Sequence, residues 1–355
     1  MLSENKCDNI ACEVISVLWG RFCNFPGLTT ENRNAPFHEA FLNAFTPKLH
    51  GIDLHQLINL SSWIQGLNTT LGQTFFENVA HILSGGEKRE FTQNKNNSMQ
   101  ISAQQQVIIN NIVTELKNNN RSPNLDQENQ LIFEIDNVKP SSLIASLDFT
   151  VDNYFETDDE IEAIELKTVR PNAGQMQGEK QKILFAKASF FIKNPNKKIK
   201  YYFAFPFDPW SDSQTGYDKD NFLSKIIEGK KFLDPNEVLL ADELWSHLSG
   251  DIGTMQEILN IINQIATPEF EEKYHFIQDP VNYSKDPTKY LRIIHAWSLH
   301  RENFLLSNFE KIKKIVSVDQ RASRSINNFV FDQHGNYNER RFNNLVSLMD
   351  QQTTL

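Results

Sequence analysis

Two carboxylates and one lysine near the middle of the chain have the types and the spacing of a centre that hydrolyses phosphodiesters. Glu165 and Lys167 lie two apart in a stretch that reads as a strand, so their side chains share one face. Asp148 begins the preceding apolar stretch, and a hairpin would bring it beside Glu165. The two carboxylates and the backbone carbonyl of Leu166 would offer Mg²⁺ its preferred oxygen ligands. The ammonium of Lys167 could then orient a water molecule and stabilise charge on phosphorus.

The spacing Glu-x-Lys is weak evidence by itself, because it occurs five times in this chain. The copy at Glu165 differs from the others because it lies in a predicted strand, whereas residues two apart on a helix diverge by about 200°. Two alternatives stay open at this point. The three side chains could form a salt-bridge cluster on the sheet surface, and Asp152 could take the place of Asp148.

The elements expected around this centre are strands with one helix among them. Apolar patterning predicts strands at residues 131–135, 147–151, 160–168 and 199–207, and a helix at 179–192. The acidic stretch 152–159 is expected to form the loop between the second and third strands. This order predicts an α/β fold with a mixed sheet flanked by helices.

The two ends of the chain are expected to be helical. Helical spacing of apolar residues predicts helices at residues 10–23, 38–45, 50–64 and 69–83, and the chain after Trp210 reads as mainly helical. In the fourth of these helices, Gln73, Glu77 and His81 fall four apart and share one face.

Composition and charge permit a DNA-binding protein without requiring one. The chain has 355 residues, of which 39% are hydrophobic, enough for a substantial core. Its net charge of -10 disfavours a nucleic-acid partner. However, eight carboxylates gather between Asp148 and Glu165, and seven lysines lie between Lys180 and Tyr201. An acidic metal centre beside a basic phosphate-binding surface would give this pattern, as would ordinary solvated faces.

Other site chemistries find little support in the sequence. The three cysteines, Cys7, Cys12 and Cys23, have no zinc-ligand spacing and their odd number disfavours a disulfide framework. No phosphate-binding GxxxxGK[ST] loop, HExxH or GxSxG motif is present. We expect no signal peptide and no membrane span, and therefore a cytoplasmic protein.

The segments that carry these residues resemble type II restriction endonucleases, and more narrowly the TdeIII family. The resemblance lies in Ser146–Val151, Ile164–Asn172 and Gly178–Leu184, and extends upstream to Leu71–Gly86. It implies a restriction-endonuclease-like core of the PD-(D/E)xK type, with Asp148, Glu165 and Lys167 as the catalytic three. It also implies that a helix before the sheet contributes Glu77. The residue before Asp148 is Leu147, where the superfamily pattern has proline.

The resemblance implies a division into three regions and a set of partners. Residues 1–65 would form a helical N-terminal region, 66–210 the nuclease core, and 211–355 a mainly helical region for DNA binding and dimerisation. The enzyme would use Mg²⁺ to cut double-stranded DNA at a short palindromic site of the form GGNCC, leaving 5′-phosphate ends. It would act as a homodimer in the bacterial cytoplasm, with a cognate DNA methyltransferase protecting the host.

Several polar residues after the Glu165 strand are candidates for DNA contact. Arg170 and Asn172 follow the strand directly, and Lys180, Gln181 and Lys182 begin the next helix. A solvated helix face is the alternative for each of the last three. The arginines that could read base edges lie in the C-terminal half, and the sequence does not choose among Arg292, Arg301, Arg321, Arg324, Arg340 and Arg341.

Two other functions compete with a sequence-specific endonuclease. The first is a DNA-binding module with a degenerate nuclease core that does not cleave, which the intact Asp148, Glu165 and Lys167 disfavour. The second is a repair or structure-specific nuclease of the same fold, which would cut without a fixed sequence.

Overall fold

A computed structural model of the chain shows two compact units. One unit comprises Met1–Leu2 and Phe76–Glu257, and the other comprises Ser3–Phe75 and Ile258–Leu355. The structure describes residues 1–26, 36, 40, 42–48, 51, 53–95, 97–134, 142–168, 173–316 and 325–353. Residues 3–75 and 258–355 thus share one unit and residues 211–257 belong with the sheet, whereas the sequence predicted three successive regions.

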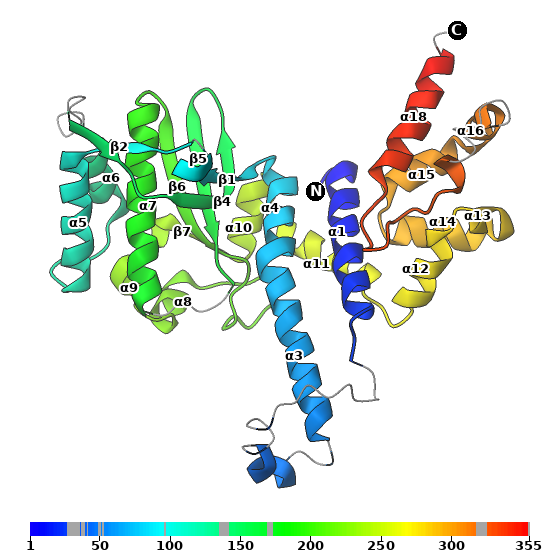
Figure 1. Ribbon diagram of the computed structural model, residues 1–355, viewed down its shortest axis with the longest axis horizontal. Coiled ribbons are helices and arrows are strands. Elements are labelled where there is room, and N and C mark those ends of the chain that lie inside the picture. Colours follow the sequence, from blue (N-terminus) through cyan, green and yellow to red (C-terminus); the bar gives the residue numbers. More distant parts are fainter. Residues whose placement is uncertain are drawn as a thin grey trace. The chain divides into compact units, whose positions relative to one another are not determined.

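The first unit is built on a five-stranded mixed sheet (Figure 1). Its strand order is β1-β4-β5-β6-β7, in which β1, β4 and β5 are antiparallel neighbours and β5, β6 and β7 are parallel. The strands are β1 (Glu87–Phe91), β4 (Phe149–Glu156), β5 (Glu160–Leu166), β6 (Lys198–Phe205) and β7 (Val238–Leu240). A separate antiparallel pair joins β2 (Gln100–Ser102) to β3 (Leu143–Ala145). The predicted α/β fold with a mixed sheet is therefore confirmed.

The β4–β5 hairpin departs from the prediction in a way that decides the site. The acidic stretch 152–159 was expected to be a loop, but β4 continues through it to Glu156, and only Thr157–Asp159 form the turn. Phe149, Val151, Asn153 and Tyr154 are buried, so packing holds the strand together despite its charges. The longer strand changes which residue of β4 lies opposite Glu165.

Helices cover both faces of this sheet. Helix α7 (Ala173–Lys193) packs on the face that carries Tyr154 and Glu165, through Phe190 and Lys182. Side chains alternate along a strand, so Asn153 and Glu162 lie on the other face. There Asn153 accepts a hydrogen bond from Ser84 of α4 (Phe76–Ser84), and Glu162 pairs with a histidine of α10 (Asp242–Ser249).

The remaining elements of the first unit pack around this core. Helices α5 (Ala103–Lys117) and α6 (Leu125–Phe133) contact each other and α7. The predicted strand at 131–135 is wrong over residues 131–133, which end α6 and bury Ile132; Ile135 lies outside the described residues. A short apolar run does not distinguish a strand from a helix end by its pattern alone. The other short elements are η3 (Gln93–Lys95), α8 (Lys219–Lys225), α9 (Gly229–Phe232) and η6 (Pro235–Glu237).

The regular elements described in the second unit are helices, together with an isolated bridge between Phe331 and Tyr337. Its core contains stacked aromatic rings, with Trp19 on Tyr274 at 4.2 Å between centroids. Its elements include α1 (Glu4–Phe22), η1 (Asn43–Lys48), α3 (Leu54–Thr70), the π-helical η2 (Leu71–Phe75), α12 (Phe270–Gln278), α13 (Asn282–Lys285), α14 (Pro287–Ala296), α15 (His300–Ser307), α16 (Phe309–Val316) and α18 (Glu339–Thr353). Helix α11 (Thr254–Ile265) spans the boundary between the units. The predicted helical character of the chain ends is confirmed.

None of the described helices is long and apolar enough to cross a membrane.

Candidate active site

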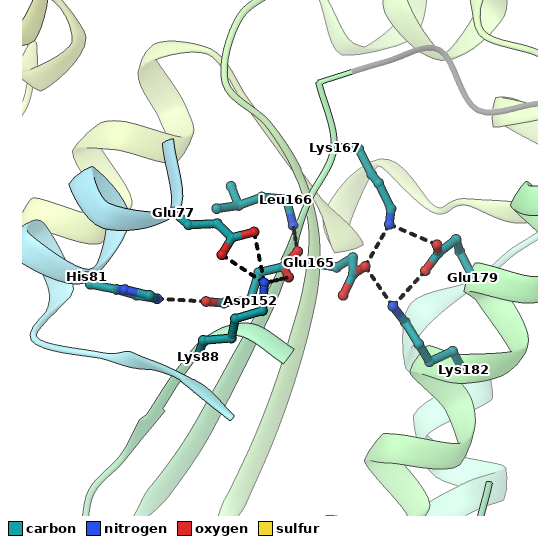
Figure 2. A network of polar contacts seen from close by, with 9 residues as sticks. All are labelled: Glu77, His81, Lys88, Asp152, Glu165, Leu166, Lys167, Glu179 and Lys182. Carbon is teal, nitrogen blue, oxygen red and sulfur yellow. Dashed lines mark hydrogen bonds and ion pairs between the residues drawn. The ribbon is translucent and has the colours of Figure 1, made fainter. Parts of the chain in front are cut away.

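The end of β5 places two carboxylates opposite each other on neighbouring strands. The β4–β5 register ends at the pair Asn153–Ile164, and Asp152 and Glu165 are the next residues on the two strands. The Oδ2 atom of Asp152 accepts a hydrogen bond of 2.9 Å from the backbone amide of Leu166 (Figure 2). The charge of Asp152 acts on the Glu165 carboxylate and contributes to raising its pKa. Asp152 and Glu165 therefore form the acidic pair that the sequence assigned to Asp148 and Glu165.

Asp148 does not reach this pair. It lies four residues before Asp152, about 13 Å along an extended chain. Its side chain is exposed and accepts a hydrogen bond of 3.3 Å from the amide of Gln93. The structure thus favours the alternative, Asp152, and the physical reason is the extension of β4 beyond its predicted end.

Helix α4 brings a third carboxylate to Asp152 through a lysine. Glu77 is mostly buried, and both its carboxylate oxygens accept hydrogen bonds from Lys88 of β1, at 3.1 and 2.9 Å. The same ammonium lies 3.7 Å from Oδ1 of Asp152. One turn after Glu77, the ring Nε2 of His81 donates to the backbone carbonyl of Asp152 at 2.7 Å. The face shared by Glu77 and His81 is therefore directed at β4, and the structure brings Glu77 to the centre.

Glu179 on α7 is a second acidic partner of Lys167, the lysine predicted to act beside Glu165. Lys167 lies 2.7 Å from Oε1 of Glu165 and 2.9 Å from Oε1 of Glu179. Lys182 lies 2.6 Å from the same Glu165 oxygen and 2.9 Å from Oε2 of Glu179. Figure 2 shows the four side chains as a closed ring of alternating charges. Glu179 was not among the residues predicted from the sequence, although its i,i+3 spacing to Lys182 indicates an ion pair on one helix face.

Burial and the charges of neighbouring carboxylates disfavour the ionised forms of Glu165 and Asp152. Burial raises the pKa of Glu165 above its ordinary value, the charge of Asp152 adds to this, and the two lysines oppose it. Burial also raises the pKa of Asp152, and the charge of Glu77 contributes. The fully buried hydroxyl of Tyr201 feels the same charges, and its pKa is raised by burial first and by Glu165 next. A cation bound beside these carboxylates would favour their ionised forms.

The structure places the candidates for DNA contact in different environments. Lys182 is at the centre itself, in contact with Glu165 and Glu179. Gln181 is directed instead at α5, where it donates to Asn110 over 3.4 Å. Arg170 and Asn172 lie outside the described residues.

Lys180 does not fit a role in phosphate binding. Its side chain is fully buried, with the ammonium 2.6 Å from Glu128 and 2.5 Å from Glu237. It could reach a phosphate only by leaving two buried carboxylates without their partner, which is costly. We therefore reassign Lys180 to the core of the first unit.

The structure also reduces the set of arginines that could contact base edges. Arg341 is buried in a pair with Glu302 at 2.6 Å, and Arg301 is bound to both Asp8 and Glu339. Both are occupied in holding the helices of the second unit together. Arg292 and Arg340 are exposed, whereas the other two candidates, Arg321 and Arg324, lie outside the described residues.

Comparison with known proteins decides the family. The family model described as "Type II restriction endonuclease, HinfI" matches residues 3–266. The chain belongs to the HinfI family of type II restriction endonucleases. It is also 44% identical over 369 aligned positions to the type II restriction enzyme MjaII of Methanocaldococcus jannaschii, with 98% of each chain covered. The restriction-enzyme class that the resemblance implied is confirmed, whereas the narrower TdeIII family stays a prediction.

Membership of the HinfI family makes this protein a site-specific deoxyribonuclease that acts on double-stranded DNA, in a class that generally uses divalent metal ions. The donor set at the centre fits such an ion. Oε2 of Glu165 is buried and has no hydrogen-bond partner among the described residues. The buried hydroxyl of Tyr201 likewise has none among them. However, no three acidic, histidine or cysteine side chains of the described residues converge into a ready-made metal site. Bound water or the backbone would have to complete the coordination of a hard cation.

Proposed function

We propose that this HinfI-family enzyme cuts DNA with Mg²⁺ in a PD-(D/E)xK-type centre formed by Asp152, Glu165 and Lys167. The observation that carries the proposal is the hydrogen bond of 2.9 Å that Asp152 accepts from the Leu166 amide, directly after Glu165 on β5, with the Lys167 ammonium 2.7 Å from Glu165. Asp152 takes the role that the sequence first gave to Asp148.

Asp152 and Glu165 would hold the metal ion, and the backbone carbonyl of Leu166 would assist them. The ion, when bound, supplies positive charge that polarises the scissile phosphate and makes water a better nucleophile. Lys167 orients the attacking water and offers its ammonium to the negative charge that develops on the phosphoryl oxygens. Lys182 reaches the same phosphate from α7.

Glu77 has a supporting part in this proposal. It binds Lys88 with both oxygens and so holds a second ammonium 3.7 Å from Asp152. This ammonium offsets the repulsion between Glu77 and Asp152, while the amide of Leu166 holds the Asp152 carboxylate toward β5.

The target and the assembly are proposed from the resemblance in the sequence. A short palindromic site of the form GGNCC calls for two centres related by a twofold axis, and therefore for a homodimer. Cleavage would leave 5′-phosphate ends. A host with such an enzyme needs a cognate DNA methyltransferase that modifies the same site.

The direct test is digestion of unmethylated phage DNA by the purified protein, with Mg²⁺ and with EDTA. Discrete bands that require Mg²⁺ are expected, and sequencing their ends gives the target and the cut position. A smear would indicate a nuclease without fixed sequence. A mobility shift of the DNA with no cutting would indicate a binding module.

A further inference from the structure

The four-membered ring of charges beside Glu165 contains one carboxylate that the proposed mechanism does not use. Glu179 lies on α7 and offers a different oxygen to each of two ammonium groups, Oε1 to Lys167 and Oε2 to Lys182, at 2.9 Å each. Glu165 receives both lysines on a single oxygen, Oε1. Oε2 of Glu165 has no hydrogen-bond partner among the described residues and contacts neither lysine, whereas Oε2 of Glu179, also without a hydrogen bond, forms an ion pair with Lys182.

Glu179 is a strong partner for these lysines. Burial acts to raise its pKa, but the hydrogen bond from Lys167 and the charge of Lys182 outweigh burial and lower it. Its side chain is 18% exposed, so the interactions are only partly screened by water. Without Glu179, both ammonium groups would depend on Glu165 alone and would neutralise the carboxylate that a metal ion needs.

The net charge of the centre also indicates that Glu179 favours cation binding. Four carboxylates and three lysines make up the contact network around Asp152 and Glu165, which gives a net charge of -1 with all seven ionised: Glu77, Asp152, Glu165, Glu179, Lys88, Lys167 and Lys182. Removing the charge of Glu179 brings the network to zero. A divalent cation would then enter a neutral centre that still contains three ammonium groups.

We infer that Glu179 is a positioning residue, which holds Lys167 and Lys182 as a pair beside Glu165 and keeps this carboxylate available to a divalent cation. The inference rests on the proposed function, because it takes Glu165 as a ligand of the metal ion. It assigns to α7 a part in metal binding as well as in DNA contact.

The first test is the Mg²⁺ affinity of the Glu179→Gln variant. Titration calorimetry of Mg²⁺ into the DNA-free protein measures this affinity independently of cleavage. We expect it to weaken about tenfold, as the loss of one unit of charge at close range in a partly buried centre implies. The Mg²⁺ concentration that gives half-maximal cleavage of saturating DNA should rise by the same factor.

A double variant tests whether the net charge of the centre determines its Mg²⁺ affinity. Glu179→Gln combined with Lys182→Gln restores the net charge of -1 and removes one of the two lysines that press on Glu165. Its Mg²⁺ affinity should return to near the wild-type value, although its cleavage rate stays low because Lys182 is missing. Glu179→Asp should keep the Mg²⁺ affinity and the KM for DNA but lower kcat, because the shorter side chain shifts both ammonium groups.

The matched control is Glu160→Gln, at the opposite end of β5. Glu160 also forms a lysine pair, at 2.8 Å to Lys200, so the variant loses the same charge far from the centre. Its Mg²⁺ affinity should equal that of the wild type. The inference is overturned if folded Glu179→Gln binds Mg²⁺ as tightly as Glu160→Gln, or if the double variant binds no better than the single one. Failure of the proposed function looks different, because the wild type itself would then neither cut DNA nor bind Mg²⁺.

Discussion

The carboxylate of Asp152 on β4 accepts a hydrogen bond of 2.9 Å from the amide of Leu166, directly after Glu165 on β5. This contact fixes the two acids on adjacent strands at one edge of the hairpin. Helix α4 approaches Asp152 from one side, and α7 approaches Glu165 from the other. The centre therefore draws on elements that are far apart in the sequence, and each can be altered separately.

Lys167→Met should abolish most cleavage without loss of DNA binding. The variant removes the ammonium that faces the reacting phosphate but retains the length of the side chain. We expect kcat to fall about 100-fold or more. Single-turnover cleavage measures the rate, and a mobility-shift titration measures the binding. An equal loss of affinity for DNA would instead place Lys167 in DNA binding and not in the reaction.

Lys180→Met should destabilise the first unit severely. It would leave Glu128 and Glu237 buried without their shared cation, at a cost of about 3–5 kcal/mol in the free energy of unfolding. Chemical denaturation gives this free energy, and a loss below about 1 kcal/mol would contradict the structural role given to Lys180 here.

Lys187→Met, on the same helix, should have the opposite effect. Lys187 is fully buried and has a hydrogen bond of 3.2 Å to Asn129, and burial lowers its pKa to about 8. At pH 7 the folded protein must therefore keep a charge that water would solvate better, and removing it should stabilise the fold by up to about 3 kcal/mol.

The pH dependence of this difference follows from linkage. Between the folded pKa of about 8 and the ordinary value of 10.5, the unfolded chain binds more protons at Lys187 than the folded chain does. The contribution of Lys187 to stability therefore becomes less unfavourable as the pH rises through this window. The advantage of Lys187→Met should shrink from pH 8 to pH 10, and an advantage that grows with pH would contradict the account.

Arg341→Met tests whether this arginine is structural. The variant leaves Glu302 buried in the second unit without its ion pair, although Tyr337 still donates to that carboxylate at 2.6 Å. We expect a large loss of stability, of about 3 kcal/mol or more, and an unchanged cleavage pattern at temperatures where the variant stays folded. Altered sequence preference in the folded variant would show instead that Arg341 takes part in base recognition.

The sequence predicted the contact between Glu165 and Lys167 but not the acid that lies beside Glu165. That contact follows from alternation along a strand, which places the two side chains on one face and needs only local pattern. Asp148 was preferred to Asp152 because charged residues 152–159 read as a loop, whereas pairing with β1 and β5 keeps the strand extended to Glu156. Register between strands is a tertiary property, and a shift of a few residues changes which acid meets Glu165.

The lysines of α7 also show that a local sequence pattern does not reveal tertiary partners. Lys180, Lys182 and Lys187 look alike in the sequence, as a basic helix beside the site. In the structure Lys182 reaches Glu165, whereas Lys180 and Lys187 are buried against α6 and the segment before β7. Their partners, Glu128, Asn129 and Glu237, lie about 50 residues away on either side. A spacing rule along one helix does not contain that information.

The most direct test of the central claim compares Asp152→Asn with Asp148→Asn in Mg²⁺-dependent cleavage of plasmid DNA that contains the target. The two variants make the same chemical change four residues apart on one strand. We expect Asp152→Asn to lose cleavage about 100-fold or more while it still binds DNA, and Asp148→Asn to cut at near the wild-type rate. An inactive Asp148→Asn beside an active Asp152→Asn would contradict it.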